Sequence, residues 1–187
     1  MFIKKIITSF FAYNIKDTKP RIIDLDQPIK IVGMAVDTDV KNIYRDVPRL
    51  GKRFVNYKKE NEIPNKKHPW VFTAVSKDFD EDRQTFTYII GDVVTSFADI
   101  PTGLITFEIP ALTYAVFPIR PKNRLGWGIA IGAAKKFVYT NWLPNSGYQS
   151  AGLIDDFEYH NERSISKRNP EIDLYVAIKA KVPASSS

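Results

Sequence analysis

Glu158 is the residue whose type and setting point most directly to chemistry. It stands between Phe157 and Tyr159 in a short apolar and aromatic segment, residues 156–160. A carboxylate that leaves water is costly unless it is paired. Such a group either stays ionised and attracts a cation, or its pKa rises and it becomes an acid. The alternative is a glutamate that faces solvent on an edge strand, since glutamate is rarely buried.

Several aromatic side chains are candidates for the walls of a pocket around that carboxylate. Aromatic rings offer apolar area and a face that attracts cations. Each ring is also compatible with ordinary core packing, and Trp142 could anchor the end of a helix before Pro144. His160 would share a strand face with Glu158 and could carry protons, or it could be an exposed loop residue. The candidates for ligand binding besides Glu158 are Tyr114, Trp142, Tyr148, Trp70, Phe72 and His160.

Composition narrows the class of protein. The 187 residues suit one domain, and the absence of cysteine excludes disulfides and thiolate metal sites. There are two histidines, His68 and His160, far apart in the sequence, so neither a metal nor a cofactor is expected. A cysteine-free chain suits the cytoplasm. The net charge of +6 is modest and favours solubility.

A basic stripe, Lys41, Arg45, Arg49, Lys52 and Arg53, lies on one side of a helical pattern. It has no interleaved aromatic residues or base-reading groups, so a solvated helix face is the better interpretation than contact with phosphates. We therefore expect no direct nucleic-acid partner.

The N-terminal segment, residues 1–15, has apolar residues at helical spacing. It predicts an amphipathic helix that packs on the domain or on a second subunit, which would allow a homodimer. Contact with a membrane surface, or a signal or anchor, is the alternative. Residues 16–20 have the composition of a linker, and residues 182–187 that of a frayed tail.

Between these ends the chain shows an order of elements that occurs twice. Hydrophobic patterns predict strand, helix, strand, strand in residues 21–99 and again in residues 100–181, with a break of the first helix at Pro48. The predicted strands cover residues 30–36, 70–75, 86–94, 113–119, 156–160 and 172–179, and the second helix covers residues 126–139. We predict an α+β domain in which the duplicated units form an antiparallel sheet with two helices and a central cleft.

Motifs in both units carry a resemblance to a known family. They are IVGMAV, EIPNKK and FTYIIGDVV in the first unit, and TYAVFPI, NWLPNSGYQ, DFEYH and EIDLYVAIKAK in the second. Their joint order over residues 21–181 resembles the GyrI-like family, which includes the gyrase-inhibitor protein, effector-binding domains of AraC-type regulators and multidrug-sensing domains. WLPxSGY followed by a Phe-Glu pair is the most specific part.

The resemblance implies a cleft for lipophilic, often cationic, compounds, with Glu158 inside it and Tyr114 on the matching strand. The family usually has Glu-x-Tyr, whereas here Tyr159 is adjacent and His160 takes the tyrosine position. A helix-turn-helix region is also missing from the pattern. The expected function is a stand-alone bacterial effector- or drug-binding domain related to transcription regulation, for sensing or sequestration. The alternatives are a hydrolase of strained electrophiles that uses Glu158 and Tyr114, and an inhibitor of a topoisomerase; a binding module is favoured over an enzyme.

Overall fold

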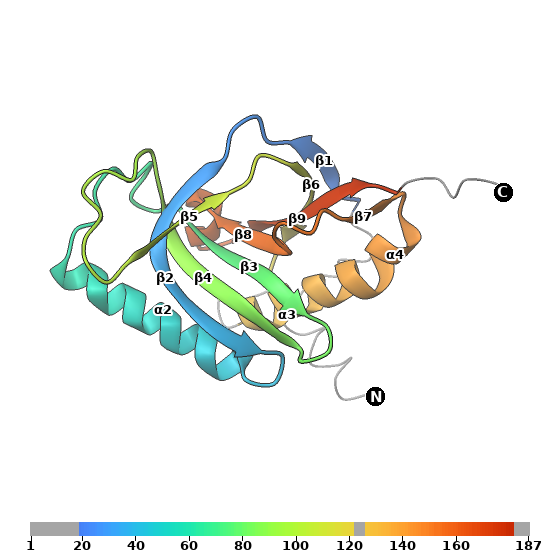
Figure 1. The fold of residues 1–187 in the computed structure, drawn as a ribbon, viewed down its shortest axis with the longest axis horizontal. Helices are drawn as coiled ribbons and strands as arrows, with labels where there is room; N and C mark the ends of the chain where they lie inside the picture. The colour runs from blue at the N-terminus through green and yellow to red at the C-terminus, as the bar shows by residue number, and fades with distance from the viewer. Residues whose placement is uncertain (1–18, 122–125, 182–187) are drawn as a thin grey trace.

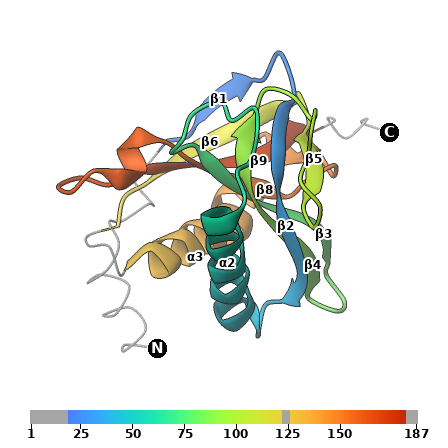
Figure 2. The same ribbon diagram turned by 90° about the vertical axis from the view of Figure 1, so that its left-hand side faces the viewer.

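The computed structural model describes residues 19–121 and 126–181, so the predictions for residues 1–18 and 182–187 lie outside the described part. Two helices lie on the same side of one large, strongly curved antiparallel sheet (Figures 1 and 2). The order of the strands is β1-β6-β9-β8-β3-β4-β2-β5, and the short β7 pairs with β9. The predicted α+β class, with an antiparallel sheet and two helices, is confirmed.

The strand–helix–strand–strand order predicted from the sequence occurs twice. The first unit consists of β2 (Ile29–Asp39), α2 (Ile43–Glu60), β3 (Phe72–Asp80) and β4 (Thr85–Val94). The second consists of β6 (Thr113–Ile119), α3 (Trp127–Phe137), β8 (Asp156–His160) and β9 (Ile172–Ala180). The shorter elements are β1 (Arg21–Asp24), β5 (Ile105–Ile109), β7 (Tyr148–Ser150) and the 3-10 turn η4 (Glu162–Ile165).

The two units meet where β3 pairs with β8 at the centre of the sheet. Ala74 and Glu158 are direct partners at the middle of that pairing. The leading strand of each unit crosses to the other one: β1 pairs with β6, and β5 pairs with β2. Each outer edge of the sheet is therefore closed by a strand from the other unit.

Alternation along the strands divides the core between the two faces of the sheet. On the helix side, α3 covers Phe117 and Leu174 of the second unit, while α2 covers Val32 and Met34 of the first. On the opposite side, a third cluster spans both units and is closed by β1, β5 and the loops beside them; it includes Val75, Ile89, Tyr114, Val116, Phe157 and Ala177. The central strands are thus buried on both faces.

Both helices depart from the sequence prediction at their prolines. Pro48 lies inside α2 and does not break it, because Leu50 and Phe54 bury the helix against the sheet. The second helix extends beyond its predicted end through a π turn, η3 (Val138–Trp142), into the short α4 (Leu143–Asn145). The N–H of Leu143 bonds five residues back, to the carbonyl of Val138. Pro144, which has no N–H to donate, follows directly after this wider turn.

None of the helices among the described residues has the length and apolar character needed to cross a membrane.

Candidate functional site

Glu158 lies at the middle of β8 and points toward the helices. Ala74, its neighbour on β3, has no side chain beyond Cβ. This leaves space for the Glu158 carboxylate at the centre of the sheet. Only 3% of Glu158 is exposed, so the alternative of a solvent-facing strand glutamate is wrong. The hydroxyl of Thr73 donates to the backbone carbonyl of Glu158 at 2.8 Å and fixes the strand here. A buried carboxylate of this kind must have partners.

Lys135 of α3 is the main partner of this carboxylate. Its Nζ lies 3.1 Å from Oε1 of Glu158 and 2.8 Å from Oδ1 of Asp156, and it donates a hydrogen bond to Oγ of Ser76 at 3.1 Å. Asp156 precedes Glu158 by two residues, so both carboxylates face the helices. The side chains of Asp156 and Glu158 are 3% and 4% exposed, against 18% for Lys135. Lys135 is thus the least buried of the three charged side chains.

Two tyrosines also donate hydrogen bonds to the acids. The hydroxyl of Tyr88 on β4 donates to Oε1 of Glu158 at 3.1 Å. The hydroxyl of Tyr139, which lies in the π turn, donates to Oδ2 of Asp156 at 2.9 Å. A π turn often occurs at a functional site, and here it carries a side chain that binds one of the acids. We refer to Ser76, Tyr88, Lys135, Tyr139, Asp156, Glu158 and His160 as the Lys135 cluster.

Glu158 and Lys135 keep their charges in the folded protein. Burial alone would raise the pKa of Glu158, but the Lys135 ammonium and His160 outweigh it and lower that pKa to about 2. Burial likewise opposes the charge of Lys135, yet Asp156 and Glu158 raise its pKa above the usual value. Burial, with the neighbouring acids, also raises the pKa of Tyr88, which keeps its hydroxyl a donor. Glu158 and Lys135 therefore form an ion pair.

Aromatic rings form one side of the site around His160. Its Nε2 lies 3.6 Å from Oε2 of Glu158. Phe72 stacks on the imidazole with ring centroids 4.1 Å apart, and Trp127 of α3 lies at 6.1 Å in a tilted arrangement. The prediction that His160 shares a strand face with Glu158 agrees with its place on β8.

The two helices lie near each other on one side of the sheet (Figure 2). Tyr44 of α2 reaches α3, because a Cβ added at Gly132 would lie 3.2 Å from the Tyr44 hydroxyl. A Cβ added at Gly128, one turn earlier, would meet nothing within 4 Å. Gly132 thus makes room for the Tyr44 side chain, while the surface at Gly128 is open.

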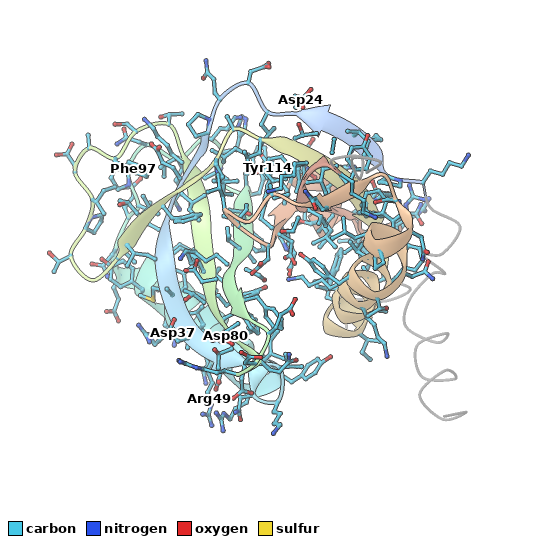
Figure 3. The ribbon with its side chains drawn as sticks, turned by 45° about the vertical axis from the view of Figure 1, so that its right-hand side comes forward. Asp24, Asp37, Arg49, Asp80, Phe97 and Tyr114 are labelled. Carbon is cyan, nitrogen blue, oxygen red and sulfur yellow. The ribbon has the colours of Figure 1, made fainter. Side chains whose placement is uncertain are left out.

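Tyr114 lies on the other face of the sheet from Glu158. It is fully buried, packs edge-on against Phe157 with ring centroids 5.3 Å apart, and donates its hydroxyl to the carbonyl of Pro110 at 2.8 Å. Figure 3 shows it on the side of Asp24 in β1, with Arg49 of α2 at the far side of the molecule. The structure does not bring Tyr114 and Glu158 together.

The other predicted aromatic residues also lie apart from the cluster. Trp142 stacks on Tyr148 with centroids 6.2 Å apart, and Phe117 packs edge-on against Trp142. Trp70 is 44% exposed and stacks on His68. Of the predicted ligand-binding residues, the structure brings together Glu158, Phe72 and His160.

Sequence reasoning missed Lys135, Asp156, Tyr88, Tyr139 and Trp127 as parts of the site. Asp156 carried a usable signal, because it is two residues from Glu158 on the same predicted strand. Lys135 carried none, since it is one of two adjacent lysines and only the packing of α3 on the sheet selects it. The exposed partner, Lys136, faces solvent.

We looked for side chains that could hold a metal ion in the part of the chain that the structure describes. Within residues 19–121 and 126–181, no three or more His, Asp or Glu side chains are grouped to hold a metal ion. The predicted basic stripe, from Lys41 to Arg53, is exposed along α2 and the turn before it.

Comparisons with known proteins agree with this architecture. The transcriptional regulator BrlR of Pseudomonas aeruginosa is 29% identical over 134 residues, which are 71% of this chain and 46% of the regulator. The chain thus spans about half the length of that relative. An integron cassette protein from the mobile metagenome of Vibrio cholerae has the same fold, with a TM-score of 0.60 at 13% identity over 91% of this chain and 98% of its own.

A second solved structure, SAV2435 bound to tetraphenylphosphonium, is similar with a TM-score of 0.59 at 11% identity, over 87% of this chain and 94% of its own. Residues 21–178 match the family described as Cass2, integron-associated effector-binding protein. The resemblance to the GyrI-like effector-binding type is thereby confirmed. The chain therefore belongs to the Cass2 family of integron-associated effector-binding proteins.

Proposed function

We propose that this chain binds a small, lipophilic organic cation between its two helices, with Glu158 as the opposing charge. The observation that carries the proposal is an ionised carboxylate that is 3% exposed at the centre of the sheet. A buried carboxylate must be paired, as Lys135 pairs it here, and a bound cation would be held by the same charge. Phe72, Trp127 and His160 supply the adjoining aromatic surface.

The family supports the small-molecule part of this proposal, and a neighbour supports the cationic part. Tetraphenylphosphonium, the compound bound by SAV2435, is a lipophilic cation. Burial of apolar surface would supply most of the affinity, while the carboxylate would select charge and orientation. Sensing through a separate regulator, or sequestration, would follow from such binding in the bacterial cytoplasm. A homodimer stays a prediction that sedimentation can check.

Catalysis by Glu158 together with Tyr114 finds no support in the geometry. The two side chains lie on opposite faces of the sheet, and the hydroxyl of Tyr114 is engaged by the carbonyl of Pro110. One substrate would have to reach both sides of a paired strand. Binding is the function that the site favours.

The test is calorimetric titration of the protein with tetraphenylphosphonium and with a lipophilic ammonium compound. We expect Glu158→Gln to weaken binding of both by about tenfold or more, since a buried charge partner is lost. Glu162→Gln, an exposed glutamate four residues later, is the matched control and should bind as the unaltered protein does. Circular dichroism confirms that each variant is folded. Equal affinity in Glu158→Gln would show that the carboxylate takes no part.

A further inference from the structure

A cation already lies against the two buried acids, and it is an ammonium group of the chain itself. Three oxygens, from Glu158, Asp156 and Ser76, lie within 3.1 Å of Lys135 Nζ. The ring of Tyr88 is the fourth neighbour, with its centroid 5.5 Å from Nζ. Three oxygen acceptors and an aromatic face are the surroundings that suit a primary ammonium, which has three N–H donors.

The contact of Lys135 with Asp156 is the weak point of this arrangement. Oδ1 of Asp156 is buried, and apart from the ion pair with Lys135 Nζ at 2.8 Å it has no hydrogen-bond partner among the described residues. Because the ammonium is tethered to α3 through its stem, its position relative to the three acceptors is fixed by the packing of that helix. An ammonium on a free molecule has no such restriction and can satisfy the remaining acceptor.

Lys135 is also the member of the trio that can leave. Its side chain is 18% exposed, whereas those of Asp156 and Glu158 are 3% and 4% exposed. Lysine has a flexible four-carbon stem and a strongly hydrated charge, so it can turn outward to water. Gly128 leaves the surface of α3 open one turn before the contact between Gly132 and Tyr44. Departure of Lys135 would leave two carboxylates for an incoming cation.

We propose that Lys135 holds the place of the ligand, and that the ligand is a protonated primary or secondary amine with an apolar body. Its ammonium replaces that of Lys135 against Asp156, Glu158 and Ser76. Cations without N–H groups, such as phosphonium and quaternary ammonium ions, leave these acceptors unpaired and bind more weakly. This selectivity rests on the proposed function, since it concerns the ligand of the same site.

A matched pair of compounds tests the selectivity on the unaltered protein. 4-Phenylbutylammonium and 4-phenylbutyltrimethylammonium share an apolar body and a charge but differ in N–H donors. Calorimetric titration at one ionic strength should give an affinity at least about tenfold higher for the primary amine. Equal affinities, or tighter binding of the trimethyl compound, would overturn the proposal.

A variant tests whether Lys135 competes with the ligand. Lys135→Met keeps most of the stem and removes the ammonium, so the affinity for 4-phenylbutylammonium should rise several-fold, about fivefold or more. Lys136→Met, at the exposed neighbouring lysine, should leave the affinity unchanged. An unchanged or lower affinity in folded Lys135→Met would contradict competition. The compound pair decides the proposal by itself if this variant does not fold.

The two proposals fail in different ways. If both compounds bind equally and Glu158→Gln weakens both, cation binding at Glu158 holds and only the amine selectivity is wrong. If Glu158→Gln changes neither affinity, or neither these compounds nor tetraphenylphosphonium bind, the proposed function itself is wrong.

Discussion

Asp156 and Glu158 share one counter-ion, so the charge state of each matters for the other. Burial opposes the charge of Glu158, but Lys135 and His160 lower its pKa to about 2 in the folded protein, from a usual value of 4.5. A lowered carboxyl pKa stabilises the fold above the unfolded value and stops doing so as the pH falls through the folded one. This contribution is therefore lost between about pH 4.5 and pH 2.

Acid unfolding should therefore distinguish the unaltered protein from Glu158→Gln. We expect the free energy of unfolding of the unaltered protein to fall more between pH 4.5 and pH 2, by on the order of 3 kcal/mol. Urea titrations of both proteins at several pH values measure the difference. Parallel pH profiles would mean that Glu158 is not held as an ion pair.

Asp155, which directly precedes Asp156, has a raised pKa, whereas that of Glu158 is lowered. Burial and the neighbouring Asp156 raise its pKa to about 6, above the usual 3.8, although its carboxylate accepts the N–H of Phe79 at 3.2 Å. A raised carboxyl pKa means that stability is lost as the pH rises from about 3.8 to 6.

Asp155→Asn should therefore stabilise the protein above pH 6, because it removes the charge and keeps an oxygen that can accept from Phe79. We expect Tm to rise by about 2–4 °C at pH 7.5. The advantage should largely vanish at pH 3.5, where Asp155 is mostly protonated in both the folded and the unfolded protein. Thermal denaturation at the two pH values measures it, and an equal shift at both would contradict this origin.

Part of the candidate site could be predicted from strand alternation taken together with the family motif. Glu158, His160 and Phe72 follow from alternation along two strands and from the family motif. Lys135 and Tyr139 come from a helix that lies elsewhere in the sequence, and their direction depends on how α3 packs and on a π turn that no local pattern announced. Tyr114 was assigned to the pocket from a motif, and its face of β6 is set by pairing with β9.

At the level of elements, β2 shows how tightly the first unit is built. Gly33 lies directly opposite Gly91 where β2 pairs with β4. A Cβ at Gly33 would lie 1.9 Å from the carbonyl oxygen of Ile90, a distance that no side chain can occupy without movement of the backbone. β2 is visibly bent along its length (Figure 1), and the glycine permits the close approach.

Gly33→Ala should therefore destabilise the protein, by about 2–3 kcal/mol or more, as overpacking does. Gly128→Ala is the matched control, because a Cβ there meets nothing within 4 Å and alanine favours the helix. Its stability should be unchanged or slightly higher. Chemical denaturation of both variants gives the comparison, and similar losses in the two would contradict the steric explanation.

The elements themselves were predictable because their hydrophobic periods are clear. The ends were less so: α2 runs through Pro48, and the second helix runs on to Asn145. Burial of Leu50 and Phe54 outweighs the hydrogen bond that Pro48 cannot make. The short β1 and β7 have little pattern of their own, and they become strands because β6 and β9 offer them an edge.

For the whole molecule, the exchange of leading strands makes the two units interdependent. β1 pairs along β6 over four residues, from Arg21 opposite Val116 to Asp24 opposite Thr113. The hydroxyl of Thr113 adds a hydrogen bond to the carboxylate of Asp24. Ile23 and Leu25 pack against the shared core on that side.

Removal of residues 19–25 should therefore lower the stability of the second unit. Two truncated proteins, one starting at residue 19 and one at residue 26, isolate this contribution. We expect the shorter protein to lose about 2–4 kcal/mol of unfolding free energy, from the burial of two apolar side chains and the lost strand pairing. Equal thermal stability of the two would show that β1 contributes nothing.

The crossing of β1 and β5 also bears on synthesis at the ribosome. When residues 29–94 have emerged, β2, β3 and β4 can pair, but β2 still shows an open edge until Ile105–Ile109 leaves the exit tunnel. β1 emerges first and waits for β6, which lies some ninety residues later in the chain. An unpaired strand edge can pair with another chain and so promote aggregation. The same exchange that closes the finished sheet at both ends thus leaves strand edges unpaired in the growing chain until the second unit appears.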